Sequence, residues 1–180
     1  MKPLHFLLLF SLLLVAGCDK DDNDQAPSKA GQLSAVTWRE SSSSLVVNGV
    51  EGIQTISATS ADTYQFGTDG KVAVTKPGGI VTTGTWALAG NDTQLTVTLG
   101  GQTQTQQIFA LTATGFSLGA AYTQAQVQAA LAGQPVAGVP NGLISLIILS
   151  AGNFTFPAGT PPVNANQITS LQLRTNLVPK

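Results

Sequence analysis

The stretch TYQFGTDGKVAV, Thr63 to Val74, has the pattern of a β-hairpin. Tyr64 and Phe66 share one face of the first strand, because alternate side chains of a strand point to the same side. The Asp-Gly pair in residues 68–70 favours a tight turn, after which the chain returns as a second alternating strand. The stretch therefore predicts two antiparallel strands joined by a tight turn.

Further short strands follow, separated by turns rich in Gly and Asn. The turns are expected at residues 77–79, 90–92 and 100–101, where Gly and Asn provide the backbone angles that tight turns need. The predicted strands between and after them are residues 80–88, 93–100, 106–111 and 115–118. This spacing predicts an all-β fold, an antiparallel meander that forms a β-barrel or a sandwich.

The last third of the chain differs in character. Thr123-x-x-Gln126 is a capping box, and it predicts one short helix over Thr123–Ala132 that ends before Gly133 and Pro135. Two or three further strands are expected, from the segments 143–149, 153–156 and 168–176, with a Pro-rich loop at 158–166. These strands would complete the barrel or form an apposed sheet.

The chain carries few charges: 9% of its residues are Asp, Glu, Lys or Arg, and its formal net charge is −1. An average domain has about 25%. Binding to nucleic acid needs clustered Lys and Arg, so no nucleic-acid partner is expected. The surface must instead be covered by Thr, Gln, Ser, Asn and Gly, a composition that favours strands and turns.

Residues 1–17 have the pattern of a secretory signal peptide. Lys2 gives a positive start, and residues 6–15 (FLLLFSLLLV) are apolar apart from Ser11. A membrane-spanning helix needs about 20 apolar residues, so this run is too short to span but fits the apolar core of a signal peptide.

Residues 15–18, Val-Ala-Gly-Cys, resemble the lipobox of bacterial lipoproteins, and Cys18 is the single cysteine of the chain. The resemblance implies cleavage before Cys18, a diacylglycerol on its thiol, and a further acyl chain such as palmitate on the new amino group. Several acyl chains anchor a protein stably, whereas one binds only marginally. A membrane partner is therefore expected through the lipid on Cys18.

Residues 18–30 are expected to form a lipidated, flexible, acidic tether. Lys20-Asp21-Asp22 resembles the export signal that sends lipoproteins of the Bacteroidota to the outer membrane. That resemblance implies a lipid-anchored protein facing the cell exterior. Two alternatives stay open: the acids only solvate the tether, or Asp19 directly after the cysteine retains the protein in the inner membrane, as in enterobacteria.

Residues 31–180 are expected to form one β domain, and residues 33–119 within it resemble the lipocalin-like lipoprotein domains of the Bacteroidota. Four motifs carry the resemblance, in this order: Trp38, Tyr64-x-Phe66-Gly67-Thr68-Asp69-Gly70-Lys71-Val72, Gly84-Thr85-Trp86-x-Leu88 and Asn91-Asp92-Thr93-x-Leu95-Thr96-Val97. Lipocalins usually have a glycine two places before the first tryptophan, where this chain has Val36. Residues 120–180 form a C-terminal extension. The resemblance implies a lipocalin-like barrel, and the departure at Val36 leaves its closure open.

The lipocalin resemblance also implies a binding site. Small barrels can enclose one ligand, and the aromatic residues expected to line such an apolar cavity are Trp38, Tyr64, Phe66, Trp86 and Phe116. Plain core packing is the alternative role for each of them. Arg174 would stack on Trp38 and close the base of the barrel, as in lipocalins, or else be a solvated charge on an edge strand.

Catalytic chemistry is not expected. The GFSLG sequence at 115–119 matches the Gly-x-Ser-x-Gly pattern of esterases. Its Ser117 lacks a base, because the single histidine, His5, lies in the predicted signal peptide. Activation of Ser117 by Lys71 or Lys76 is the formal alternative, and alternation of Phe116 and Leu118 around an exposed Ser117 is the favoured interpretation.

Metal ions and other cofactors are not expected either. Without histidine, and with Cys18 acylated, zinc and copper lack ligands. Asp62, Asp69 and Asp92 are expected to be turn-forming residues rather than Ca²⁺ ligands. No glycosidase motif surrounds these acids, Glu40 or Glu51.

Two functions follow from the sequence. The first is a surface-exposed lipoprotein whose lipocalin-like barrel binds a small hydrophobic ligand. The second is a structural or interaction protein with a solid barrel, whose partners are surface proteins or glycans. An interior cavity above about 300 Å³, the low end of ligand pockets, would distinguish the first from the second.

Overall fold

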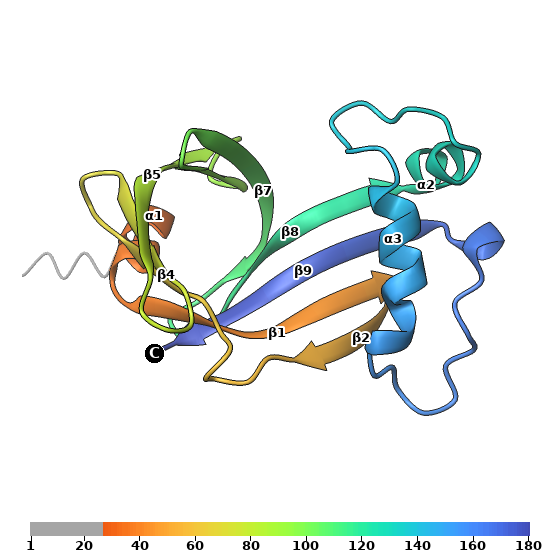
Figure 1. The fold of residues 1–180 in the computed structure, drawn as a ribbon, viewed down its shortest axis with the longest axis horizontal. Helices are drawn as coiled ribbons and strands as arrows, with labels where there is room; N and C mark the ends of the chain where they lie inside the picture. The colour runs from red at the N-terminus through yellow and green to blue at the C-terminus, as the bar shows by residue number, and fades with distance from the viewer. Residues whose placement is uncertain (1–26) are drawn as a thin grey trace, which may run out of the picture.

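The computed structural model describes residues 27–180, so the predicted signal peptide, Cys18 and most of the predicted tether lie outside the described residues. The described part is mostly strand (Figure 1). Its elements in chain order are α1 (Lys29–Ser34), β1 (Thr37–Val47), β2 (Val50–Thr55), β3 (Thr63–Phe66), β4 (Lys71–Thr75), β5 (Val81–Ala89), β6 (Gln94–Leu99), β7 (Gln102–Leu111), β8 (Phe116–Thr123), α2 (Gln124–Leu131), α3 (Leu143–Leu149), the 3₁₀ turns Ser150–Asn153 and Ala165–Gln167, and β9 (Ser170–Pro179).

The sheet closes into a barrel because β1 has partners on both sides. Its first residues, Thr37–Arg39, pair with β3, and Trp38–Val47 pairs antiparallel with β9. Together with the continuous order from β3 to β9, this closes an eight-stranded antiparallel barrel within residues 27–180. The predicted all-β, lipocalin-like barrel is confirmed, and the sandwich alternative is wrong.

The strands β1, β8 and β9 extend beyond one end of the barrel, as Figure 1 shows. There they form an open sheet with β2 in the order β2-β1-β9-β8, and α2 and α3 pack on one face of it. Because residues two apart in a strand share a face, Leu171 and Leu173 under the helices lie on the same face as Thr175 and Leu177 inside the barrel.

Each end of the molecule has its own hydrophobic core. The barrel core includes Leu33, Trp38, Phe66, Val72, Leu95 and Phe116. The core under the helices includes Leu45, Tyr122, Val127, Ile144, Ile147 and Leu171. Both cores are built from residue 33 onward, so a chain from Asp19 to Lys180 contains all of their buried side chains.

The predicted hairpin at 63–74 is confirmed as β3 and β4. In its turn, Asp69 Oδ1 accepts a hydrogen bond from the backbone N–H of Lys71 at 3.1 Å, and Gly70 has a φ of 77°. Asp residues commonly stabilise turns in this way. The strands predicted at 80–88, 93–100, 106–111 and 115–118 are also present, and the last two are longer than expected.

The predicted helix at 123–132 is confirmed as α2, with Thr123 as its N-cap and Ala132 as its C-cap. Both hydrogen bonds of the capping box are formed: Gln126 N–H donates to Thr123 Oγ1 at 3.3 Å, and Thr123 N–H donates to Gln126 Oε1 at 2.9 Å.

The strand predicted at 143–149 is wrong, because this segment is the helix α3. Ile144 and Ile147 lie three residues apart, share one helix face and are buried, while Leu146 and Leu149 point to solvent. An unbroken apolar run has no period of its own, so its pattern cannot separate a buried strand from a helix.

Two other expectations for the C-terminal third had different outcomes. Residues 153–156 do not form a strand, since a 3₁₀ turn ends at Asn153 and only Thr155 forms an isolated bridge, with Ile53. The strand expected at 168–176 is present as β9. It both completes the barrel and continues into the helix-covered sheet.

The beginning of the folded part also differs from the expected boundary. The helix α1 includes Lys29 and Ala30, which the sequence assigned to the tether, and its Leu33 is fully buried. The strand β2 and the hairpin that it forms with β1 were not predicted. Its turn is an Asn48-Gly49 pair with φ of 52° and 83°, which is the residue pair that tight hairpin turns favour.

Candidate functional site

The barrel contains a cavity of about 330 Å³. Its walls are mainly apolar and include Tyr64, Phe66, Leu95, Val97, Phe116 and Leu177. Polar side chains also line it, among them Asp62, Lys76, Thr82 and Gln104. An apolar cavity with a few polar groups is the usual composition of a site for a small molecule.

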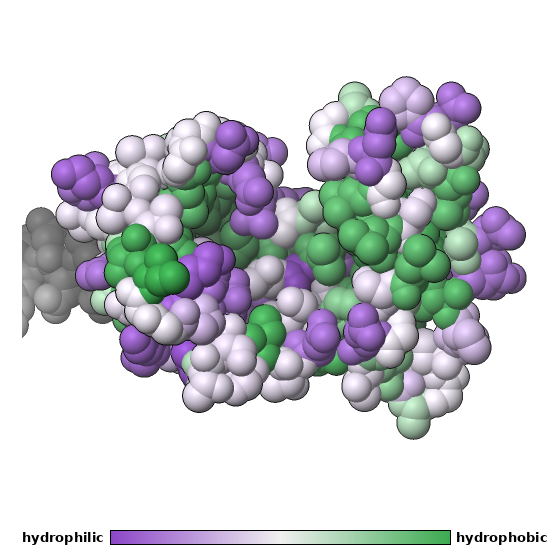
Figure 2. All heavy atoms as spheres, viewed as in Figure 1, coloured by the Kyte–Doolittle hydropathy of each residue, from purple (hydrophilic) through white to green (hydrophobic). Residues whose placement is uncertain are grey.

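The polar side chains mark the open side of the cavity, because Lys76, Thr82 and Gln104 are exposed to solvent. Figure 2 shows the surface hollowed between the barrel and the helix-covered end of the molecule. The strand β7, which contributes Gln104 and Gln106 to the lining, borders this hollow on the barrel side (Figure 1).

The structure divides the five predicted site residues into two groups. Tyr64, Phe66 and Phe116 line the cavity. Trp38 is fully buried in the core beside it, with its ring 5.6 Å from that of Phe116 and its indole N–H donating to the carbonyl of Leu33 at 2.9 Å.

Trp86, like Trp38, does not line the cavity. It is half-buried, packs edge-on against Phe66 with ring centroids 5.4 Å apart, and donates its indole N–H to the carbonyl of Gly67 at 2.9 Å. The two tryptophans therefore pack behind the aromatic wall and fix its position, since each indole is held by a backbone hydrogen bond.

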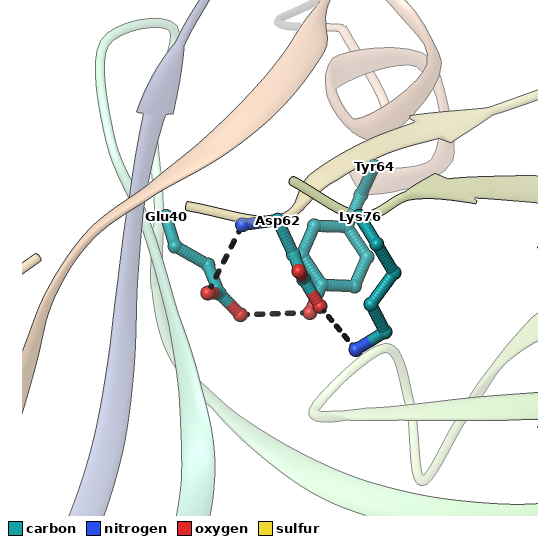
Figure 3. Close-up of polar contacts among 4 residues, drawn as sticks. All are labelled: Glu40, Asp62, Tyr64 and Lys76. Carbon is teal, nitrogen blue, oxygen red and sulfur yellow. Dashed lines mark hydrogen bonds and ion pairs between the residues drawn. The ribbon is translucent and has the colours of Figure 1, made fainter. Parts of the chain in front are cut away.

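A network of four polar side chains lies at one side of the cavity (Figure 3). The hydroxyl of Tyr64 donates to Glu40 Oε1 at 2.8 Å. The backbone N–H of Asp62 donates to Glu40 Oε2 at 3.4 Å. The side chain of Asp62 forms an ion pair with Lys76, with 2.7 Å between Oδ2 and Nζ. Of these four, Asp62, Tyr64 and Lys76 line the cavity.

The surroundings of these groups shift two of their pKa values. Burial, and next the hydrogen bond to Glu40, raises the pKa of Tyr64 above its usual range, so its hydroxyl stays protonated and remains a donor. The hydrogen bond to Asp62, and then the charge of that carboxylate, raises the pKa of Lys76. At neutral pH the phenol of Tyr64 is therefore neutral and Lys76 carries its ammonium charge.

This network was not predicted from the sequence, where Glu40 and Asp62 were considered as unrelated acids. They meet because the start of β1 pairs with β3, which brings Trp38 opposite Tyr64. One signal was present: Glu40 lies two residues after Trp38 and Asp62 two residues before Tyr64, so strand alternation puts all four on one face.

The predicted contact between Arg174 and Trp38 is wrong. The guanidinium carbon of Arg174 lies 4.5 Å from the ring centroid of Phe109 instead. Arg174 pairs with Ser44 in the middle of β9, whereas the residue opposite Trp38 is Pro179 at the end of that strand. It therefore lies too far along the strand to reach the base of the barrel.

The exposed position expected for Ser117 is also wrong. Ser117 is half-buried, and within residues 27–180 its buried hydroxyl oxygen has no hydrogen-bond partner. It pairs with Asn176, whose amide donates to the hydroxyls of Ser42 and Ser44 at 3.1 Å and 2.6 Å.

Among residues 27–180, no three His, Cys, Asp or Glu side chains come together as a metal site would require. Asp69 and Asp92 lie in separate turns, and the carboxylate of Asp62 forms an ion pair with Lys76. In the same part of the chain, no helix has the length and apolar character needed to cross a membrane.

Comparisons with protein-family models, with curated proteins and with solved structures found no significant match to this chain.

Proposed function

We propose that this chain is a lipoprotein of the Bacteroidota type, anchored in the outer membrane through lipid on Cys18, whose lipocalin-like barrel binds a small hydrophobic or amphipathic molecule without catalysing a reaction. The observation that carries the binding role is the cavity of about 330 Å³ inside the barrel. It exceeds the low end of ligand pockets, about 300 Å³, whereas a solid barrel would leave no such space.

The volume of the cavity limits the size of the ligand. At about 30 Å³ per water molecule, 330 Å³ corresponds to roughly ten water molecules. A molecule with an apolar body of comparable size would fit, such as a decyl chain. Its apolar part would contact Phe66, Val97 and Phe116, and its polar end would lie at the side marked by Lys76 and Gln104.

The test is titration of the chain from Asp19 to Lys180 with N-phenyl-1-naphthylamine, an apolar dye whose fluorescence rises when it leaves water. We expect saturable binding of one dye per chain. Val97→Trp would fill the cavity and weaken dye binding at least tenfold, while Val81→Trp, at an exposed site outside the lining, would leave it unchanged. Circular dichroism of each variant checks that it is folded. No saturable binding by the folded chain would contradict the proposal.

The anchoring role rests on the lipobox resemblance and has its own test. Cys18→Ser removes the nucleophilic sulfur that the lipid requires, so the variant should leave the membrane fraction and lose incorporation of labelled palmitate. Protease added to intact cells should degrade the original chain if it faces the exterior. Membrane association of Cys18→Ser equal to that of the original chain would contradict lipid anchoring.

One observation favours the alternative function, an interaction protein of the cell surface. Leu146 and Leu149 on α3 are 63% and 83% exposed, and Figure 2 shows hydrophobic side chains gathered over that helix. The helices α1 and α3 lie at opposite ends of the molecule (Figure 1), so an anchor that precedes α1 would leave α3 free to meet a partner. Failure of the folded chain to bind the apolar dye would make this function the stronger candidate.

A further inference from the structure

The charges around the cavity do not cancel. Glu40 and Asp62 are carboxylates, and Lys76 is a cation that forms an ion pair with Asp62, with 2.7 Å between Nζ and Oδ2. Among the residues lining the cavity, Asp62 and Lys76 are the charged ones. Within residues 27–180 the other ion pair, between Lys71 and Asp69, involves two exposed side chains that do not line the cavity. The network as a whole therefore carries one excess negative charge.

That excess charge belongs mainly to Glu40. Its two oxygens accept hydrogen bonds from the hydroxyl of Tyr64 and the backbone N–H of Asp62, which are neutral donors. Such bonds stabilise a carboxylate but leave its charge in place. Lys76 is held by Asp62, so its charge is already balanced before any ligand arrives.

We propose that the cavity selects a molecule with an apolar body and a positively charged amine head, and discriminates against a carboxylate on the same body. This inference rests on the proposed binding function and names its ligand class. An amine at the polar side of the cavity meets a network with net negative charge, whereas a carboxylate adds a second uncompensated negative charge. One excess charge beside the head-group site is expected to change affinity by about tenfold.

The test is displacement of N-phenyl-1-naphthylamine from the chain Asp19 to Lys180 by decylamine, decanol and decanoate at neutral pH. These compounds share one apolar chain and differ in head-group charge. We expect decylamine to bind about tenfold more tightly than decanol, and decanoate to bind more weakly than decanol. Added salt should reduce the difference, because it screens charges that water reaches.

Three variants assign the preference to named groups. Glu40→Gln removes the excess charge and should bring decylamine and decanol to equal affinity. Lys76→Met leaves both carboxylates without a cation and should increase the preference for decylamine. Lys71→Met makes the same change in net charge outside the cavity and should leave the preference as it is. If Glu40→Gln does not fold, Lys76→Met and Lys71→Met still make opposite predictions.

The outcomes separate this inference from the function on which it rests. Binding of all three decyl compounds with equal affinity, or tightest binding of decanoate, would overturn the selectivity and leave the carrier function standing. If neither the dye nor any decyl compound binds to the folded chain, the carrier function and the selectivity both fail.

Discussion

Tyr64 on β3 donates its hydroxyl hydrogen to Glu40 on β1 at 2.8 Å, across the shortest strand pairing that closes the barrel. Only three residue pairs, from Thr37–Gln65 to Arg39–Thr63, join β1 to β3. The hydrogen bond from Tyr64 and the one from Glu40 N–H to the carbonyl of Asp62 at 3.1 Å extend this junction. The network beside the cavity therefore also holds the barrel closed.

The first prediction concerns alkaline pH. The sequence has two tyrosines, Tyr64 and Tyr122, and burial raises the pKa of both above the ordinary value of 10.0. Above that value the unfolded chain loses phenol protons that the folded chain keeps, so the free energy of unfolding should fall as pH rises beyond 10. We expect the ultraviolet absorbance of the Tyr64 phenolate to appear only as the fold is lost.

Variants assign this effect to individual groups. Tyr64→Phe should reduce the loss of stability above pH 10, and Tyr122→Phe should reduce it less, because Tyr64 also faces Glu40. Ionisation of either tyrosine near pH 10 while the near-ultraviolet circular dichroism stays native would contradict the prediction.

The second prediction concerns close packing between β8 and β9. A Cβ atom at Gly119 would lie 1.9 Å from the carbonyl oxygen of Leu173, which is backbone and cannot rotate away. We expect Gly119→Ala to lower the free energy of unfolding by about 1–3 kcal/mol or more. Gly152→Ala is the matched control, because that Cβ meets no atom within 4 Å. Equal urea midpoints for the two variants would show that β8 and β9 can separate without cost.

The third prediction distinguishes the two faces of α3. Ile144 is fully buried, so Ile144→Ala should destabilise the protein by about 2–5 kcal/mol. Leu146 is 63% exposed, so Leu146→Ala should change stability by less than about 0.5 kcal/mol. Thermal and urea unfolding of both variants would measure the difference. A strand in this segment, buried on both faces, would instead make both substitutions costly.

The fourth prediction concerns the capping box of α2. Thr123→Ala removes the hydroxyl that accepts from Gln126 N–H and should cost about 0.5–2 kcal/mol. Thr123→Ser keeps that acceptor and should recover most of the loss. Gln124→Ala changes an exposed neighbour that takes no part in the box and serves as the control. Equal stability of the alanine variants at 123 and 124 would mean that the cap contributes nothing measurable.

Features that depend on neighbours in the chain could be predicted from the sequence. The turn at 68–70 needs only an Asp that reaches Lys71 N–H and a Gly with positive φ, and the cap of α2 needs only Thr123 and Gln126. The alternation of Tyr64 and Phe66 likewise predicted a shared face, which the structure confirms as part of the cavity wall.

Features that depend on contacts distant in the chain needed the folded molecule. Residues 143–149 become a helix because Ile144 and Ile147 are buried against an open sheet that the strand pattern alone does not reveal. Which aromatics line the cavity and which pack behind it depends on how the ring of strands closes. Glu40, Asp62, Tyr64 and Lys76 meet for the same reason, since three strands must pair before their side chains share one face. Local backbone chemistry is written within a few consecutive residues, whereas the register and closure of a barrel depend on all its strands at once.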